Sequence, residues 1–370
     1  MGPILRMTHT GSIATLWLSM PPLLIKSAIC DPETERVVAM LAARLGAGVY
    51  EIRHDHPATL IADALRLRHT FDQRSVVHAF GMPALAIASL GRRGGIVFSP
   101  VRDPSNQQIG WLRAVSAYRP LEVLCSSDTV RRRLVTRGMP ADRCHIARPG
   151  VKFSAISKKR DTDLRRRFGF SDTDTVLLVP LEITHNSGHG LAMWATSILH
   201  IVQPHYRLLV WGRGPALETL AHVRNVILKP GMMTIATDID PAIEIEPLFS
   251  AADGILMTPS GNVSPMLIAM AMASGRPIVA TITQQLCELI EDRHTALLVK
   301  NPTQRGIAQR IMDLFADTQL AQQLQDRAGA EAYDYLTAGK FIDACEKIYA
   351  KVDGARHSAD SPILANPSDA

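Results

Sequence analysis

Short apolar runs alternate with amphipathic stretches along most of this 370-residue chain. Residues 176–179 are apolar at every position, as is typical of a strand that helices cover on both faces. Between such runs, apolar residues recur at the three- and four-residue spacing of helices. Strands that alternate with helices predict parallel sheets joined by right-handed crossovers, and therefore an α/β fold.

The same pattern places the individual elements. Strands are expected at 48–52, 75–80, 95–98, 122–125, 144–147, 176–180, 206–211, 226–228, 254–257, 277–281 and 296–299. Helices are expected at 31–45, 128–137, 188–200, 215–224, 265–274 and 303–316. An interrupted apolar run over 13–25 lacks a clean small-residue cleavage site, so we expect a buried strand and turn there rather than a signal peptide.

A polar stretch divides the chain. A strand ends at Arg148-Pro149-Gly150-Val151, residues 152–167 are strongly charged, and a new apolar strand starts at Thr175. Because 370 residues exceed the roughly 100–200 of one domain, two domains are expected. We predict a Rossmann-like domain over 1–155, a second over 156–335, a C-terminal helix over 336–352 that returns to the first domain, and a disordered tail over 353–370.

Composition narrows the class of protein. Hydrophobic residues make up 46% and charged residues 20%, which suits a globular chain with real cores. The five cysteines are scattered and never in a C-x-x-C spacing, which argues against zinc or a disulfide framework and for a reducing compartment. No apolar run reaches the roughly 18 residues of a membrane span. We therefore expect a cytoplasmic protein.

The net charge is +5, which is too little for a dedicated nucleic-acid binder. Arginines cluster at 131–133 and at 165–167, without the interleaved aromatic residues that would stack on single strands. Solvated helix faces explain such clusters. The alternative is a surface that meets anionic lipid or an anionic substrate, which would make the protein membrane-peripheral.

The loops that follow the strands are the places to search for chemistry, since ligands bind beyond the carboxyl ends of parallel strands. The loop over 258–264 leads into the helix at 265–274, with Ser264 at the N-cap and Pro265 at the first helical position. The free amides of residues 263–267 would suit a diphosphate. An ordinary capped helix that binds nothing gives the same pattern.

Two further loops carry glycine. In the loop over 181–189, Gly188 would let the backbone approach a ligand. His185 and His189 in the same loop stand four residues apart, but no third metal ligand accompanies them. The second, residues 211–215, is only a fragment of a dinucleotide-binding glycine pattern, in which Arg213 faces either phosphate or solvent.

The first half of the chain offers fewer candidates. His78 stands near the end of one expected strand and Ser99 at the end of the next. His78 is a candidate acid/base or substrate-orienting group, and the alternative is a hydrogen-bonded structural histidine. The chain has no G-x-S-x-G motif, no Ser-His-Asp signature and no Walker loop.

Four segments share an order with a known family. Residues 146–151 read I-A-R-P-G-V, residues 211–215 W-G-R-G-P, residues 271–281 A-M-A-S-G-R-P-I-V-A-T and residues 288–292 E-L-I-E-D. In this order they resemble the retaining, nucleotide-sugar-dependent glycosyltransferases of family 4, most specifically in the last two segments. The resemblance implies the GT-B architecture, in which two doubly wound Rossmann-like domains face a central cleft.

The chain departs from that family at its polar signature positions. The family's two glutamates fall at Asn262 and Met270, its diphosphate-binding Arg and Lys at Glu182 and Ser187, and its first-domain histidine near Ser99. The candidate catalytic residues are His78, Ser99 and Asn262. The candidate donor-binding residues are Ser187, Gly188, Gly212, Arg213, Asn262, Ser264, Pro265, Met266, Met270 and Glu288.

The resemblance implies a divergent glycosyltransferase. It would move a sugar with retention from a UDP-, GDP- or ADP-sugar to an unidentified glycan, lipid or small-molecule acceptor, with no tightly bound cofactor and no metal. The lost signature positions leave a second reading open, a catalytically impaired GT-B protein that binds a sugar, a nucleotide or a partner glycosyltransferase. A third is another GT-B enzyme, such as a sugar-nucleotide epimerase.

Overall fold

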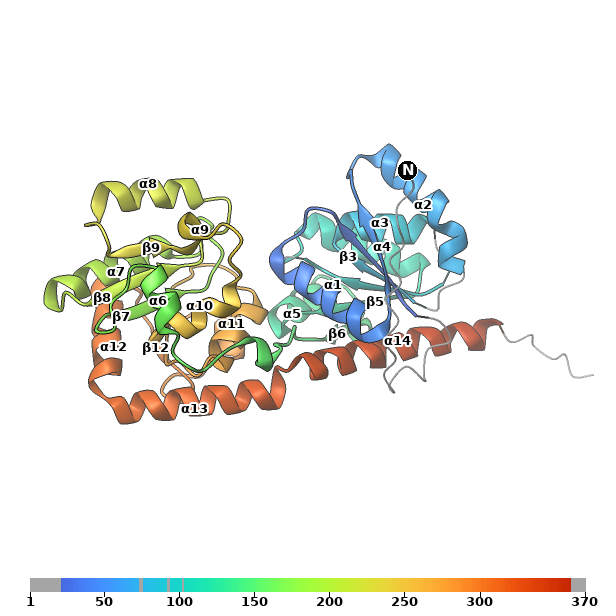
Figure 1. The fold of residues 1–370 in the computed structure, drawn as a ribbon. Helices are drawn as coiled ribbons and strands as arrows, with labels where there is room; N and C mark the ends of the chain where they lie inside the picture. Colours follow the sequence, from blue (N-terminus) through green and yellow to red (C-terminus); the bar gives the residue numbers. More distant parts are fainter. Residues whose placement is uncertain (1–20, 73–75, 92–93, 102, 361–370) are drawn as a thin grey trace, which may run out of the picture. The chain divides into compact units, whose positions relative to one another are not determined.

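The computed structural model describes residues 21–72, 76–91, 94–101 and 103–360 (Figure 1). Most of the apolar run at 13–25 and the last ten residues of the tail lie outside this part of the chain. The described residues form two compact units. The first contains those up to Arg148 and those from Gly339 onward, and the second is Pro149–Ala338.

The first domain is built around a six-stranded parallel sheet of order β2-β1-β3-β4-β5-β6. Its strands are β1 (Leu23–Ser27), β2 (Gly48–Ile52), β3 (Val77–Phe80), β4 (Ile96–Ser99), β5 (Leu121–Cys125) and β6 (Cys144–Ile146). Its helices are α1 (Pro32–Leu45), α2 (Pro57–Asp72), α3 (Met82–Gly91), α4 (Asn106–Tyr118), α5 (Asp128–Thr136), the 3₁₀ helix η1 (Ala141–Arg143) and α14 (Ala338–Asp360).

The second domain repeats this plan with strand order β12-β11-β10-β7-β8-β9, again all parallel. Its strands are β7 (Thr175–Val179), β8 (Tyr206–Val210), β9 (Met233–Ile235), β10 (Gly254–Met257), β11 (Ile278–Thr281) and β12 (Leu297–Val299). Its helices are η2 (Phe153–Ala155), α6 (Thr162–Arg167), α7 (His189–Val202), α8 (Leu217–Ile227), α9 (Ala236–Ile239), α10 (Ile245–Ala251), α11 (Pro265–Ala273), η3 (Leu286–Glu288), α12 (Gln304–Ala316) and α13 (Thr318–Tyr335).

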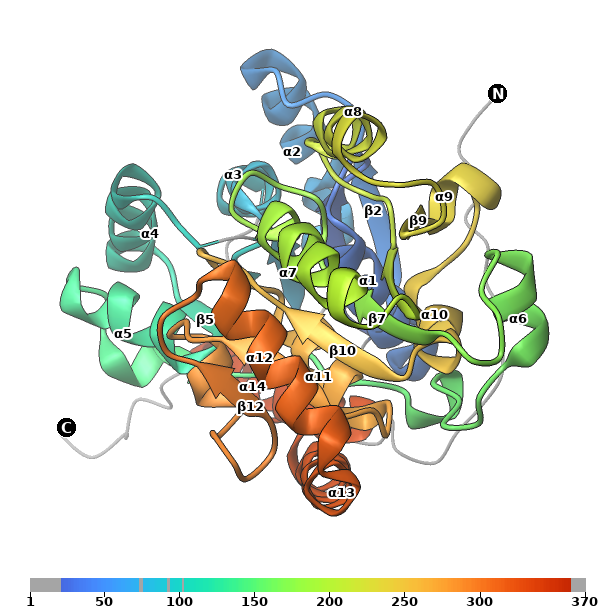
Figure 2. The ribbon, with the colours of Figure 1, turned by 90° about the vertical axis from the view of Figure 1, so that its left-hand side faces the viewer.

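Helices cover both faces of the second sheet. Because right-handed crossovers run in opposite directions from β7 and from β10, their helices lie on opposite faces. α7 packs against α12 on one face, and α11 packs against α13 on the other. Figure 2 shows α7 and α12 side by side on the near face. The predicted α/β architecture of two doubly wound parallel sheets is confirmed.

Three details differ from the sequence prediction. The apolar residues 226–228 are not a strand, because α8 continues to Ile227, and the third strand of that half is the unpredicted β9. The last helix, α14, runs to Asp360 and so enters the segment expected to be disordered. An apolar run at a helix end and a short strand carry the same local pattern, which explains the first error.

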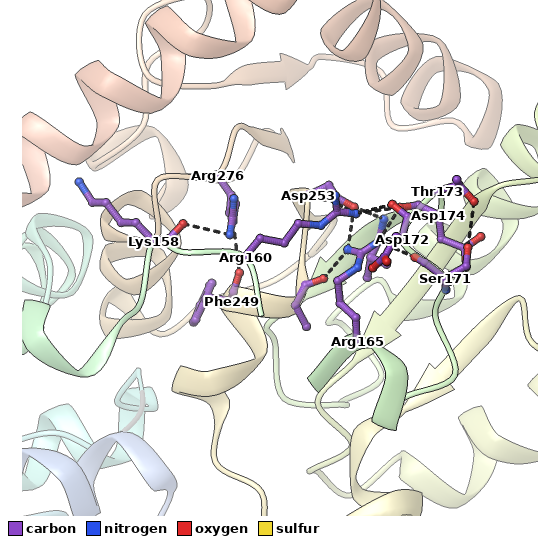
Figure 3. Close-up of polar contacts among 12 residues, drawn as sticks. Lys158, Arg160, Arg165, Ser171, Asp172, Thr173, Asp174, Phe249, Asp253 and Arg276 are labelled. Carbon is purple, nitrogen blue, oxygen red and sulfur yellow. Dashed lines mark hydrogen bonds and ion pairs between the residues drawn. The ribbon is translucent and has the colours of Figure 1, made fainter. Parts of the chain in front are cut away.

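One of the three arginines at 165–167 is part of the core (Figure 3). Arg165 is fully buried, and its Nη1 donates to Asp253 Oδ2 at 2.9 Å and to the Ala251 carbonyl at 2.8 Å. Asp253 Oδ2 also accepts from the Val176 amide at 2.8 Å. This pair joins α6 to the start of β7 and to the turn before β10. The expectation of a solvated face therefore fails for Arg165, although it fits the exposed Arg166.

Candidate functional site

The second sheet changes direction between β7 and β10, which are neighbours in the sheet but not in sequence. From β7 the chain continues to β8, and from β10 it continues the other way to β11. The loops that leave the carboxyl ends of these two strands therefore diverge. Such a switch point is where ligands bind in open α/β sheets.

The two loops at this switch point are tied together. Thr258 Oγ1 donates to the Gly188 carbonyl at 2.9 Å, and the Ser260 amide donates to the Asn186 carbonyl at 2.9 Å. Gly188 has φ +74°, and a Cβ built on it would lie 1.7 Å from the Thr258 carbonyl oxygen. The close approach predicted at Gly188 is thus to the backbone of the neighbouring loop, which explains why the position needs glycine.

Ser187 and His189 stabilise the loop after β7 from inside. Ser187 Oγ lies 2.6 Å from His189 Nδ1, 2.7 Å from the Thr184 carbonyl oxygen and 3.0 Å from the Thr184 amide. Burial lowers the pKa of His189 to about 4, so the ring is neutral near pH 7. His185, four residues before it, is exposed, so the two histidines do not form a pair. The Ser187 hydroxyl is engaged within the loop.

The loop after β8 packs on the loop after β7. The Ile183 amide donates to the Arg213 carbonyl at 2.6 Å. Gly212 and Gly214 both have positive φ, and a Cβ on Gly214 would come within 2.4 Å of the Ile183 carbonyl oxygen. A Cβ on Gly212 would meet Thr237 Oγ1 at 2.1 Å. Gly214 therefore lets the loop after β8 pack on the loop after β7, and Gly212 lets it pack on the start of α9.

Arg213 brings a positive charge to this edge. Its guanidinium carbon lies 5.5 Å from the centre of the Trp211 ring, and its Nη2 lies 3.6 Å from Glu244 Oε1. Its side chain is 38% exposed, so solvent weakens this ion pair. The guanidinium combines a fixed position over the indole with access to solvent, which an anion-binding group requires.

The start of α11 offers fewer free amides than the sequence suggests. Leu267 N donates to Ser264 Oγ at 3.2 Å, as expected of an N-cap. Val263 N donates to the Gln285 side chain at 2.7 Å, and Pro265 has no N–H. Of the five predicted positions, the amides of Ser264 and Met266 remain for an anion.

Asn262 and Met270 lie in different surroundings. Asn262 is exposed in the loop just before α11. Met270 is 4% exposed on α11, a helix in which every residue is buried. Glu288 is half-buried in η3, after β11. The loop position is therefore open to a ligand, whereas the methionine fills the core.

His78 and Ser99 are brought together in the first domain, where the strands β3 and β4 pair. His78 Nε2 lies 2.8 Å from Ser99 Oγ, and Nδ1 lies 2.6 Å from the Tyr349 hydroxyl of α14. His78 is fully buried, which lowers its pKa to about 3. Because both ring nitrogens have partners inside the domain, the geometry favours the structural role of His78 over contact with a substrate.

The first domain has a cavity of about 260 Å³ at its own switch point, where β1 and β3 diverge. Its walls are mostly apolar, with polar groups at Ser27, Asp55 and Gln108. Ser27 Oγ lies 3.4 Å from Asp55 Oδ1. The local sequence pattern does not mark these residues as a site. The strand that ends at Ser27 overlaps the end of the interrupted apolar run at 13–25, so the pattern does not show where the strand stops.

No group of three or more His, Cys, Asp or Glu side chains in 21–360, with its short gaps, is placed to hold a metal ion. None of the helices in the same part of the chain is long and apolar enough to cross a membrane.

Comparison with known proteins agrees with this geometry. Residues 177–317 match the family model described as Glycosyl transferases group 1. A D-inositol 3-phosphate glycosyltransferase of Pseudarthrobacter chlorophenolicus is 30% identical over 203 residues, or 53% of this chain and 47% of that protein. An N-acetyl-alpha-D-glucosaminyl L-malate synthase of Bacillus anthracis is 22% identical over 198 residues, 52% of this chain and 49% of that protein. The chain thus spans about half the length of the curated relatives it matches.

Solved structures match the whole fold. A glycosyltransferase from Rickettsia africae superposes with a TM-score of 0.74 at 14% identity, over 90% of this chain and 99% of that one. Anabaena HepE, in complex with UDP and glucose, gives the same TM-score and identity over 90% and 100%. The chain therefore has the GT-B architecture of glycosyltransferases. Residues 177–317, within its second domain, are similar to glycosyl transferases group 1, in agreement with the family resemblance of the sequence.

Proposed function

We propose that this protein is a glycosyltransferase that binds a nucleotide-sugar on its second domain and passes the sugar to an acceptor on its first. The observation that carries the proposal is the switch point between β7 and β10. The loops after β7, β8 and β10 meet there, and all three lie within the residues matched by the family model. The related fold of Anabaena HepE was solved with UDP and glucose, which supports a nucleotide-sugar donor.

The donor diphosphate would lie between Arg213 and the start of α11. The Arg213 guanidinium and the amides of Ser264 and Met266 can each donate to phosphate oxygens. Each charge-assisted hydrogen bond is worth about 1.5–3 kcal/mol. They would replace the cations that the family carries at the positions of Glu182 and Ser187.

The transfer would proceed with retention at the sugar carbon. The groups named above would stabilise the departing diphosphate, while the exposed Asn262 would hydrogen-bond donor hydroxyls. No tightly bound cofactor and no metal is needed for this chemistry. We infer a cytoplasmic location from the five free thiols, which suit a reducing compartment.

The first-domain cavity is the proposed acceptor subsite. Its apolar walls would cover a sugar ring or an alkyl group. Asp55 would accept hydrogen bonds from hydroxyl groups of the acceptor, and the Ser27 hydroxyl would donate or accept them. Its volume of about 260 Å³ suits a group about the size of one sugar unit.

Calorimetric titration with UDP, GDP and ADP tests the donor site. We expect one nucleotide to bind, and Arg213→Gln to weaken it about ten- to a hundredfold. Arg166→Gln is the matched control, because Arg166 is exposed on α6, before the opposite end of β7. Equal affinity in the wild type and Arg213→Gln would remove Arg213 from the site. No binding of any of the three would contradict the donor proposal.

One observation favours a second function, a non-catalytic protein that binds a nucleotide or a sugar. Asn262 and Met270 replace the two carboxylates of the family, and Met270 is buried in the core of α11. Such a protein would be stabilised by a nucleotide without consuming a nucleotide-sugar. Thermal unfolding and donor turnover, measured on the same samples, distinguish the two functions.

A further inference from the structure

We propose that Gln285 is a further donor-binding residue, whose side-chain nitrogen donates a hydrogen bond to a phosphate oxygen of the nucleotide-sugar. The inference rests on the proposed function, because it adds a contact within the same site. Gln285 follows β11 and directly precedes η3, and it is 5% exposed. Its side chain reaches the loop that leads from β10 into α11.

A single backbone group fixes the orientation of the Gln285 carboxamide. The Val263 amide donates to Gln285 Oε1 at 2.7 Å, and this hydrogen bond is buried. Because the N–H of Val263 is a donor, the carboxamide atom that faces it must be the oxygen. The NH₂ group of Gln285 therefore occupies the other position of the carboxamide, away from Val263.

The loop over 258–264 is also held by its two neighbours in the sheet. The hydrogen bonds of Thr258 and Ser260 described above join it to the loop after β7. On the other side, Thr281 Oγ1 at the end of β11 donates to the Pro259 carbonyl at 2.8 Å. These bonds define where the loop after β11 lies relative to the start of α11.

The Gln285 nitrogen is available to a ligand. Within the described part of the chain no residue accepts a hydrogen bond from Nε2, and this atom is not fully enclosed. A glutamine NH₂ group carries two donors. Gln285 thus presents two N–H groups at the carboxyl edge of the sheet, although the residue as a whole is almost completely buried.

The same nitrogen lies close to the proposed diphosphate position. Nε2 is bonded to the carbon that carries Oε1, so it lies within about 5 Å of the Val263 nitrogen. The next amide along the chain is that of Ser264, which is one of the groups proposed to hold the diphosphate. A phosphate oxygen bound there would be within reach of Gln285, and an ionised oxygen is a strong acceptor.

Calorimetric titration of the full chain with UDP, GDP and ADP tests this inference. Gln285→Glu keeps an oxygen for the Val263 amide but replaces the NH₂ group by a second carboxylate oxygen. We expect an unfolding temperature close to that of the wild type and nucleoside diphosphate binding about tenfold weaker or worse. The corresponding nucleotide-sugar should lose the same factor, because the contact is to the phosphates that both ligands share.

Gln284→Glu is the matched control, because Gln284 is exposed and lies one residue away in the same loop. It adds the same charge, and its effect on nucleotide binding should stay below about twofold. Gln285→Met is the second variant, since it removes the NH₂ group without adding a charge, and it should also bind about tenfold more weakly.

A measurement on the wild type keeps the test valid if both Gln285 variants fail to fold. In protein with isotope-labelled glutamine, the side-chain amide signals of Gln285 should shift when the nucleoside diphosphate is added, whereas those of Gln284 should not.

Three results would overturn the inference. One is equal nucleotide binding by Gln285→Glu and Gln284→Glu. Another is a loss confined to the nucleotide-sugar, which would assign the nitrogen to the sugar and not to the phosphates. The third is a Gln285 amide signal that the nucleotide leaves unchanged. In all three the wild type still binds a nucleotide, so the proposed function stands. A wild type that binds none of the three nucleotides would overturn the proposed function and this inference together.

Discussion

Thr258 Oγ1 donates a hydrogen bond to the carbonyl oxygen of Gly188 at 2.9 Å. This bond joins the loops that leave β7 and β10, two strands that pair in the sheet but are separated by about seventy residues of sequence. The proposed donor site stands on this junction. The close packing of the two loops depends on glycine at residue 188.

Gly188→Ala should destabilise the second domain by at least about 1–3 kcal/mol, because the new Cβ would overlap the Thr258 carbonyl and φ is +74°. The control is Gly190→Ala, on α7, where a Cβ meets nothing within 4 Å. That change should be neutral or stabilise by up to about 1 kcal/mol. Urea unfolding of both variants measures the difference, and equal stability would show that the two loops are not in contact.

Arg165→Ala should cost about 3–5 kcal/mol, because it leaves Asp253 without its buried partner. The neighbouring Arg166 pairs with Asp163 on the surface, so Arg166→Ala should change the free energy of unfolding by about 0.5 kcal/mol or less. Denaturant titration of the two variants compares identical substitutions one residue apart. Similar losses in both would contradict the burial of Arg165.

Tyr349→Phe should destabilise the first domain by about 1–3 kcal/mol. The change keeps the shape of the ring but leaves the buried His78 Nδ1 without its partner. Tyr118→Phe, at an 86% exposed position, should have no measurable effect. The unfolding temperature of both variants provides the measurement, and no loss in Tyr349→Phe would show that α14 does not depend on this hydrogen bond.

The free energy of unfolding should decrease as the pH is lowered through the acid range. Burial lowers the pKa of His78 from 6.5 to about 3 and that of His189 from 6.5 to about 4. Below about pH 6.5 the histidines are protonated in the unfolded chain but stay neutral in the folded chain. Their contribution to stability is therefore fully present above that pH and is lost as the pH falls. Each histidine adds a slope of up to about 1.4 kcal/mol per pH unit.

His78→Gln isolates the part due to one histidine. The substitution lowers stability at all pH values, but the plot of unfolding free energy between about pH 6 and pH 4 should become flatter. The slope is the informative quantity, because a merely structural loss shifts the whole curve. An unchanged slope would mean that His78 is protonated in the folded protein.

The sequence predicts the elements of this fold better than their contacts. Ser264-Pro265 marks the start of α11 correctly, because capping is a local property. The partner of His78 is 271 residues away, and no local pattern reveals that its ring is enclosed by Tyr349. In the same way, three consecutive arginines look alike in sequence, and only packing shows that Arg165 is in the core.

Donor turnover distinguishes a glycosyltransferase from a protein that only binds a nucleotide. The protein would be incubated with a panel of UDP-, GDP- and ADP-sugars, and the released nucleoside diphosphate would be measured. We expect release from one class of donor, slowed about tenfold or more in Arg213→Gln and unaffected in Arg166→Gln. No release from any donor, in a preparation that a nucleotide still stabilises against heat, would contradict catalysis and leave a nucleotide-binding GT-B protein.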